Sequence, residues 1–207
     1  MSARIKICGL FRMEDIAYAN AVKPDYVGFV FAKSRRQVNR EMAAKMRKAL
    51  NPDILAAGVF VDAPCGEIVE CLEEGLIDLV QLHGKETEAD IRYLKSATGK
   101  PLIKAVRPSC AKEVQAWLDS EADYLLFDSG AGSGKTFDWS LLEGVNRDYF
   151  LAGGLHEGNL PGAIREMAPF AVDLSSGVET NGVKDLEKMR TAVRLVRGGN
   201  LRKGEEV

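Results

Sequence analysis

Short apolar runs rich in β-branched residues alternate with amphipathic segments from one end of the chain to the other. The runs have the length of strands, and the segments between them repeat their apolar residues at helical spacing. We predict strands over Arg4–Cys8, Tyr26–Phe31, Ala56–Val61, Leu79–His83, Leu102–Val106, Tyr124–Asp128, Tyr149–Ala152 and Ala171–Ser175. We predict helices over Glu14–Ala21, Arg40–Leu50, Pro64–Glu74, Glu88–Thr98, Ala111–Leu118, Trp139–Gly144, Asn159–Met167 and Lys184–Val196.

This order of elements predicts one closed domain. Strands that alternate with helices form a parallel sheet covered by helices. Eight strand–helix units without a break in composition predict an α/β fold of the (β/α)8 TIM barrel class, a parallel eight-stranded closed sheet. The length of 207 residues suits a single barrel. We expect the barrel to span residues 1–197, with a polar C-terminal tail over 198–207.

Side chains alternate along a strand, which separates those that face the helices from those that face the barrel. In the first strand Ile5 and Ile7 would face the helices, whereas Lys6 and Cys8 would face the barrel. The same alternation turns these polar side chains of later strands inward: Gln81, His83, Asp128, Asp173 and Ser175. Barrel enzymes carry their chemistry at the C-terminal ends of the strands, so Cys8 and Asp128 are expected at one mouth.

Cys8 stands at the top of the first strand, with Lys6 one inward step below it. A free cysteine is usually a small buried hydrophobe, but a nearby cation favours the reactive thiolate. The first and last strands of a closed barrel are neighbours, and a buried lysine needs a partner. We therefore expect Lys6 to pair with Asp173 and to favour the thiolate of Cys8.

A glycine-rich loop follows the strand that ends at Asp128. Gly134-Lys135-Thr136 matches the end of a nucleotide-binding P-loop, but Ser129 occupies the place of the first glycine, so we reject that interpretation. The segment Gly132–Trp139 is instead a candidate lid. Asp138 is the better cap for the next helix, which leaves Asp128 to act as a general acid if burial raises its pKa.

Small residues also follow the seventh and eighth predicted strands, in Gly153-Gly154 and Ser176-Gly177. Both could be ordinary tight turns, but barrels commonly bind phosphate through the backbone amides of these two loops. Arg36, after the second strand, is either a solvated surface charge or a guanidinium that binds a carboxylate in bidentate fashion. His83 is either a third catalytic group or a polar wall residue of the same site, and we favour the wall residue.

Composition excludes several classes of function. A net charge of −2 gives no reason to expect nucleic-acid binding. No apolar run approaches the ~18 residues of a membrane span, and the N-terminus lacks the apolar stretch of a signal peptide. The four cysteines form no C-x-x-C pair and there are only two histidines, so we predict no metal site. Free thiols suggest the cytoplasm, and the oligomeric state stays open.

These residues, in this order, resemble the phosphoribosylanthranilate isomerase family of tryptophan biosynthesis. The resemblance covers nearly the whole chain and is carried by Lys6–Leu10, Val27–Phe31, Gly58–Val61, Val80–Gly84, Gly132–Trp139 and Val172–Glu179. It implies an Amadori rearrangement of N-(5-phosphoribosyl)anthranilate without a cofactor. It further implies general acid Asp128, general base Cys8, a carboxylate on Arg36 and a phosphate held by Gly153, Gly154, Ser176 and Gly177.

Two kinds of alternative are left open by the residues themselves. One is another phosphate-binding barrel enzyme, such as a sugar-phosphate epimerase or a lyase of the indole pathway. An epimerase of that type would need metal-binding histidines, in which this chain is poor. The other is a non-catalytic barrel that binds a phosphosugar and would tolerate the loss of Cys8 and Asp128. Activity on the related histidine-pathway aminoaldose is also left open.

Overall fold

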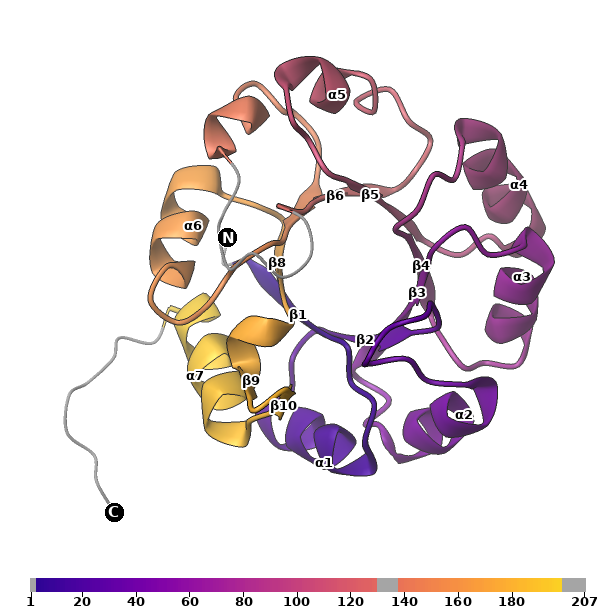
Figure 1. Ribbon diagram of the computed structural model, residues 1–207, viewed down its shortest axis with the longest axis vertical. Coiled ribbons are helices and arrows are strands. Elements are labelled where there is room, and N and C mark those ends of the chain that lie inside the picture. The colour runs from indigo at the N-terminus through magenta and orange to yellow at the C-terminus, as the bar shows by residue number, and fades with distance from the viewer. Residues whose placement is uncertain (1–2, 130–137, 199–207) are drawn as a thin grey trace.

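The computed structural model describes residues 3–129 and 138–198. Its centre is a closed barrel of parallel strands paired in sequence order, β1 to β8, with β8 pairing back to β1. In Figure 1 these strands form an inner ring, and the helices surround it. The barrel strands are β1 (Arg4–Cys8), β2 (Tyr26–Val30), β3 (Leu55–Phe60), β4 (Leu79–Leu82), β5 (Leu102–Val106), β6 (Tyr124–Phe127), β7 (Tyr149–Leu151) and β8 (Ala171–Leu174).

Most of the strands are followed by an α-helix that packs on the outside of the barrel. The α-helices are α1 (Met13–Val22), α2 (Arg40–Ala49), α3 (Cys65–Glu73), α4 (Glu88–Thr98), α5 (Ala111–Gln115), α6 (Leu160–Met167) and α7 (Leu186–Val196). Two short 3-10 helices, η1 (Trp139–Leu142) and η2 (Ser176–Val178), follow β6 and β8. None of the helices in the described part of the chain has the length and apolar character needed to cross a membrane.

The predicted barrel is confirmed, and the differences lie at the ends of elements. The helix predicted over Trp139–Gly144 is the 3-10 helix η1, capped by Asp138, whose Oδ1 accepts from Ser140 N at 3.0 Å. The prediction that the last helix begins at Lys184 was wrong. Lys184 belongs to β10 (Val183–Lys184), which pairs antiparallel with β9 (Glu179–Thr180).

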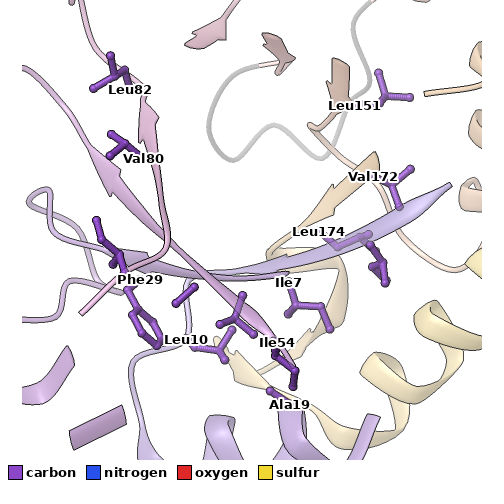
Figure 2. Close-up of a cluster of buried hydrophobic side chains, with 14 of the residues drawn as sticks. Ile7, Leu10, Ala19, Phe29, Ile54, Val80, Leu82, Leu151, Val172 and Leu174 are labelled. Atoms are coloured by element: carbon purple, nitrogen blue, oxygen red, sulfur yellow. The ribbon is translucent and has the colours of Figure 1, made fainter. Parts of the chain in front are cut away.

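Two apolar layers hold the barrel. The larger one lies between the strands and the helices, and Figure 2 shows part of it, with Ile7 of β1, Phe29 of β2 and Leu174 of β8. Ile5 and Ile7 belong to this layer, as the alternation along β1 predicts. Burial of such side chains stabilises the fold by about 1.5–3 kcal/mol each.

The smaller layer fills the inside of the barrel and is closed at its lower end by aromatic rings. Phe150 packs edge-on against Tyr26 and Tyr124, with ring centroids 5.6 and 5.5 Å apart. The Arg4 guanidinium lies 4.9 Å from the centre of the Phe170 ring and donates to the Tyr26 hydroxyl at 2.8 Å. The interior is therefore packed below, and the polar side chains gather at the opposite end.

Two sequence predictions fall partly or wholly outside the described residues. Residues 132–137 of the candidate lid, Gly132–Trp139, lie outside them. The predicted C-terminal tail over 198–207 also lies outside them, except for Gly198.

Candidate active site

Cys8 ends β1 at the mouth of the barrel, where it is partly accessible. Its neighbour across the sheet is Gly28 of β2, and a Cβ on Gly28 would lie 2.6 Å from the Cys8 sulfur. Only a glycine at this position leaves room for the thiol. The backbone of Cys8 is held from the other side, because Ser175 Oγ donates to its carbonyl oxygen at 3.0 Å.

The predicted pair of Lys6 and Asp173 is present inside the barrel. Lys6 and Asp173 are in register across β1 and β8, and Lys6 Nζ donates to Asp173 Oδ2 at 2.8 Å. The Lys6 side chain is completely buried, and burial alone would lower its pKa. The charge of Asp173 and its hydrogen bond to Lys6, together with Cys8, outweigh that effect and raise the pKa of Lys6, so the ammonium stays charged.

The expectation that Lys6 makes Cys8 a thiolate needs correction. Burial raises the pKa of the Cys8 thiol above the ordinary value of 9.0, and the charge of Asp173 adds to that rise. Lys6 and Lys184 pull the pKa down but do not overcome burial. The thiol is therefore the favoured form at neutral pH, and the two lysines limit how much energy its deprotonation requires.

Asp128 directly follows β6 at the same mouth and lies against His83, which follows β4. The atoms His83 Nε2 and Asp128 Oδ2 are 3.3 Å apart, and both side chains are 16% exposed. Gln81 Nε2 lies 3.0 Å from His83 Nδ1, so the two ring nitrogens of His83 face Gln81 and Asp128 respectively. The structure thus places His83 as a neighbour of Asp128.

Arg36 already holds a carboxylate, that of Glu179 at the start of β9. Arg36 Nε donates to Glu179 Oε1 at 2.7 Å, and Nη2 donates to Oε2 at 3.0 Å. The Arg36 side chain crosses Gly9, where an added Cβ would lie 2.4 Å from Arg36 Cδ. The guanidinium therefore lies beside the residue that follows Cys8.

Glu179 is the centre of a cluster of cations. Lys184 Nζ lies 2.8 Å from Glu179 Oε1, and Arg35 Nη2 lies 2.5 Å from Oε2. Burial alone would raise the pKa of Glu179, but the hydrogen bonds from Arg36 and the charge of Lys184 lower it to about 2. The carboxylate is therefore ionised at any physiological pH.

The predicted phosphate loops lie against each other. Gly153 and Gly154 have positive φ angles of 87° and 64°, and a Cβ on Gly177 would lie 1.9 Å from the carbonyl oxygen of Leu155. Across residues 3–129 and 138–198, the backbone N–H groups of Gly154, Ser176 and Gly177 donate to no protein acceptor. Three donors with small side chains are thus left for an anion at the ends of β7 and β8.

Sequence reasoning missed Gly28, Glu179 and Lys184. Glu179 and Lys184 lie on the hairpin formed by β9 and β10. The sequence contained a signal for this hairpin, because Asn181-Gly182 is a common two-residue turn between antiparallel strands. Its φ angles of 51° and 82° are those of such a turn. The strands on either side are too short to show an alternating pattern. In the described ranges, no group of three or more His, Cys, Asp or Glu side chains is arranged to hold a metal ion.

A family profile and individual relatives of this chain indicate the same family. The sequence profile described as N-(5'phosphoribosyl)anthranilate (PRA) isomerase matches residues 5–194. The N-(5'-phosphoribosyl)anthranilate isomerase of Endomicrobium trichonymphae is 46% identical over 199 residues, covering 94% of this chain and 98% of its own length. That of a Thermoanaerobacter species, strain X514, is 43% identical over 202 residues, with 94% and 98% covered.

Solved structures give the same result. The crystal structure of phosphoribosyl anthranilate isomerase from Thermotoga maritima superposes with a TM-score of 0.86 at 35% identity, covering 95% of this chain and 99% of the other. A phosphoribosyl anthranilate isomerase in complex with reduced 1-(o-carboxyphenylamino)-1-deoxyribulose 5-phosphate superposes with a TM-score of 0.84 at 34% identity, with 95% and 99% covered. This chain belongs to the N-(5'-phosphoribosyl)anthranilate isomerase family.

Proposed function

We propose that this chain catalyses the Amadori rearrangement of N-(5-phosphoribosyl)anthranilate to 1-(2-carboxyphenylamino)-1-deoxyribulose 5-phosphate in tryptophan biosynthesis. Membership of the family supports the reaction. The observation that carries the assignment of residues is that Cys8 ends β1 and Asp128 follows β6, with the Lys6–Asp173 ion pair of 2.8 Å joining β1 to β8 below Cys8. A thiol and a carboxyl group thus lie at one barrel mouth.

Asp128 is the general acid in this proposal. Its carboxylic acid gives a proton to the ring oxygen of the ribose, the bond between C1 and that oxygen breaks, and the nitrogen lone pair forms a C1=N double bond. The product of this step is an open-chain Schiff base with a positive nitrogen. His83, 3.3 Å from Asp128, orients the carboxyl group.

Cys8 is the general base. Its thiolate takes the proton from C2, the electrons of that bond form C1=C2, and the electrons of C1=N return to the nitrogen. The resulting enolamine tautomerises to the ketone. Because the Schiff-base nitrogen accepts the electron pair, this step requires no cofactor.

The acid and the base must hold one proton between them, and it must sit on Asp128. Burial of the Cys8 thiol works against this distribution, whereas the positive charges of Lys6 and Lys184 favour it. These lysines therefore contribute to catalysis by increasing the fraction of enzyme in which Cys8 is deprotonated. Placing the proton correctly is part of a general acid–base contribution of about 10²–10⁴-fold per group.

The two anionic ends of the substrate have separate binding groups in this proposal. The N–H groups of Gly153, Gly154, Ser176 and Gly177 bind the phosphate, supported by the absence of protein acceptors for Gly154, Ser176 and Gly177 in the described ranges. The remaining N–H groups of Arg36 bind the anthranilate carboxylate. We also propose the cytoplasm as the compartment, because all four cysteines are free thiols.

The direct test is turnover of N-(5-phosphoribosyl)anthranilate, followed by the loss of its anthranilate-type fluorescence. We expect the purified protein to consume this substrate and to form the carboxyphenylamino ketose. A non-catalytic phosphosugar-binding barrel would leave the fluorescence unchanged. Turnover of a sugar phosphate without the anthranilate group, and none of the proposed substrate, would instead favour the epimerase alternative.

A further inference from the structure

Apart from Lys184, the cluster around Glu179 takes no part in the proposed acid–base steps, yet it is built around the proposed carboxylate-binding residue Arg36. We propose that Glu179 is a positioning residue that fixes the guanidinium of Arg36, and that the β9–β10 hairpin thereby sets the preference for a substrate carrying a carboxylate. This inference rests on the proposed function, because it concerns the same substrate-binding mouth.

Glu179 binds Arg36 through both of its oxygens, at 2.7 Å to Nε and 3.0 Å to Nη2. Two parallel hydrogen bonds define the plane of a guanidinium, whereas a single bond allows it to rotate. The Glu179 side chain is only 4% exposed, so water competes little for these bonds.

Arg36 keeps one edge of its guanidinium that Glu179 does not use. A guanidinium has five N–H donors, and Glu179 uses the edge formed by Nε and Nη2. Among the described residues, Nη1 of Arg36 has no hydrogen-bond acceptor. The edge formed by Nη1 and Nη2 can therefore receive a second carboxylate in bidentate fashion. The arginine lies across Gly9, next to Cys8, so this edge belongs to the catalytic mouth.

The Glu179 cluster also contains more cations than anions. Arg35, Arg36 and Lys184 all contact the single carboxylate of Glu179, so the cluster keeps an excess of positive charge. Lys184 is completely buried, and its Nζ donates to Glu179 and to the carbonyl oxygen of Ser175. Glu179 alone would neutralise Arg36, whereas the two extra cations leave the mouth attractive to an anion.

The hairpin also connects this cluster to the catalytic cysteine. Lys184 Nζ lies 3.0 Å from the Ser175 carbonyl oxygen, and Ser175 Oγ lies 3.0 Å from the Cys8 carbonyl oxygen. Arg35 Nη1 donates to the Gly182 carbonyl in the turn of the hairpin at 2.8 Å. Arg36 and Cys8 are thereby held in one framework, although the hairpin lies far from both in sequence.

The test compares two ligands that differ only in the carboxylate. These are reduced 1-(o-carboxyphenylamino)-1-deoxyribulose 5-phosphate and the same molecule without the carboxyl group, both titrated by calorimetry. In the Glu179→Gln variant we expect the carboxylated ligand to bind about 10-fold or more weakly, the size of one charge-assisted hydrogen bond or more. We expect the ligand without the carboxylate to bind within about 2-fold of wild type, since it makes no contact that depends on Arg36.

A double-mutant cycle with Arg36→Ala separates positioning from a general structural role. If Glu179 acts through Arg36, Glu179→Gln has little further effect once Arg36 is removed. The Glu187→Gln variant, which breaks an exposed pair with Arg190 on α7, is the matched control and should bind both ligands like wild type. If Glu179→Gln does not fold, Glu179→Asp takes its place in the cycle, because aspartate keeps the negative charge and has a side chain one methylene shorter.

Three results would overturn the inference. The first is an equal loss of affinity for both ligands in Glu179→Gln. The second is an effect of Glu179→Gln on affinity that is as large in the Arg36→Ala background as in wild type. The third is unchanged affinity of Glu179→Gln for the carboxylated ligand. Failure of the proposed function has a different signature. In that case the wild-type protein would not discriminate between the two ligands and would not turn over N-(5-phosphoribosyl)anthranilate.

Discussion

At the scale of single residues, the proposed chemistry depends on which of two groups, Cys8 or Asp128, holds the one proton that they share. Cys8 sits where burial opposes its ionisation, while Lys6 and Lys184 favour it. The sequence was sufficient to place Lys6 below Cys8 and opposite Asp173. It could not show that burial outweighs the lysine, because that balance depends on how closely the thiol is packed against Gly28 and its neighbours.

This balance predicts the pH dependence of the reaction. If Asp128 and Cys8 share one proton, kcat/KM is flat between two pKa values and falls on either side. Because burial raises the pKa of Cys8, the alkaline fall should lie above the ordinary pKa of a thiol. Replacing Lys6 by Met removes a charge that lowers this pKa, so the plateau should drop and the alkaline fall should move to higher pH.

The measurement is kcat/KM from pH 6 to about 11, the range that covers an ordinary thiol pKa on both sides. Lys95→Met, which breaks a pair between the last turn of α4 and Asp123, directly before β6, serves as a control and should leave the profile unchanged. An alkaline fall centred well below the ordinary thiol pKa would contradict the assignment of Cys8.

At the scale of elements, the loops after β7 and β8 pack closely against each other, and the N–H groups of Gly154, Ser176 and Gly177 have no protein acceptor among the described residues. The sequence indicated these loops through their small residues. It did not reveal β9 and β10, since a strand of two residues has no alternation to read. From the sequence, Glu179 was consequently only the last residue of Val172–Glu179, one of the segments that carry the family resemblance. In the structure its carboxylate contacts Arg35, Arg36 and Lys184.

The contact between the two loops can be tested by adding one methyl group. A Cβ on Gly177 would lie 1.9 Å from the Leu155 carbonyl oxygen, so Gly177→Ala must displace backbone. We expect it to reduce the free energy of unfolding by about 1–3 kcal/mol and to raise KM for the phosphorylated substrate.

Gly162→Ala in α6 is the matched control, because the nearest atom to its added Cβ is 3.7 Å away. A glycine inside a helix should instead gain about 0.5–1 kcal/mol on this change. Urea unfolding and steady-state kinetics of the two variants provide the comparison. Equal behaviour of the two variants would show that the loops are not packed as described.

At the scale of the whole molecule, the barrel brings the first and last strands together and thereby builds the site. The alternation of apolar residues predicted the fold and its inward-facing positions, because a closed parallel sheet leaves few arrangements for eight strand–helix units. The ion pair between Lys6 and Asp173 joins β1 to β8 inside the barrel, where the Lys6 side chain is completely buried. Closure of the sheet and support of Cys8 therefore depend on the same contact.

Removing one member of this pair should be severe. Lys6→Met leaves the Asp173 carboxylate buried without its cation, and we expect a loss of about 3–5 kcal/mol in the free energy of unfolding. The double variant Lys6→Met/Asp173→Asn removes both charges and should lose less than Lys6→Met alone. Denaturant unfolding of the three proteins measures this difference. A Lys6→Met variant as stable as wild type would mean that the pair does not secure the barrel.

The central claim is that Asp128 and Cys8 are the acid and the base of the isomerisation. The most direct measurement is the turnover number of Cys8→Ala and of Asp128→Ala with N-(5-phosphoribosyl)anthranilate, with circular dichroism to confirm the fold. We predict that each substitution lowers kcat by about 10²–10⁴-fold while the barrel stays folded. Near-normal turnover in either folded variant would contradict the role proposed for that residue.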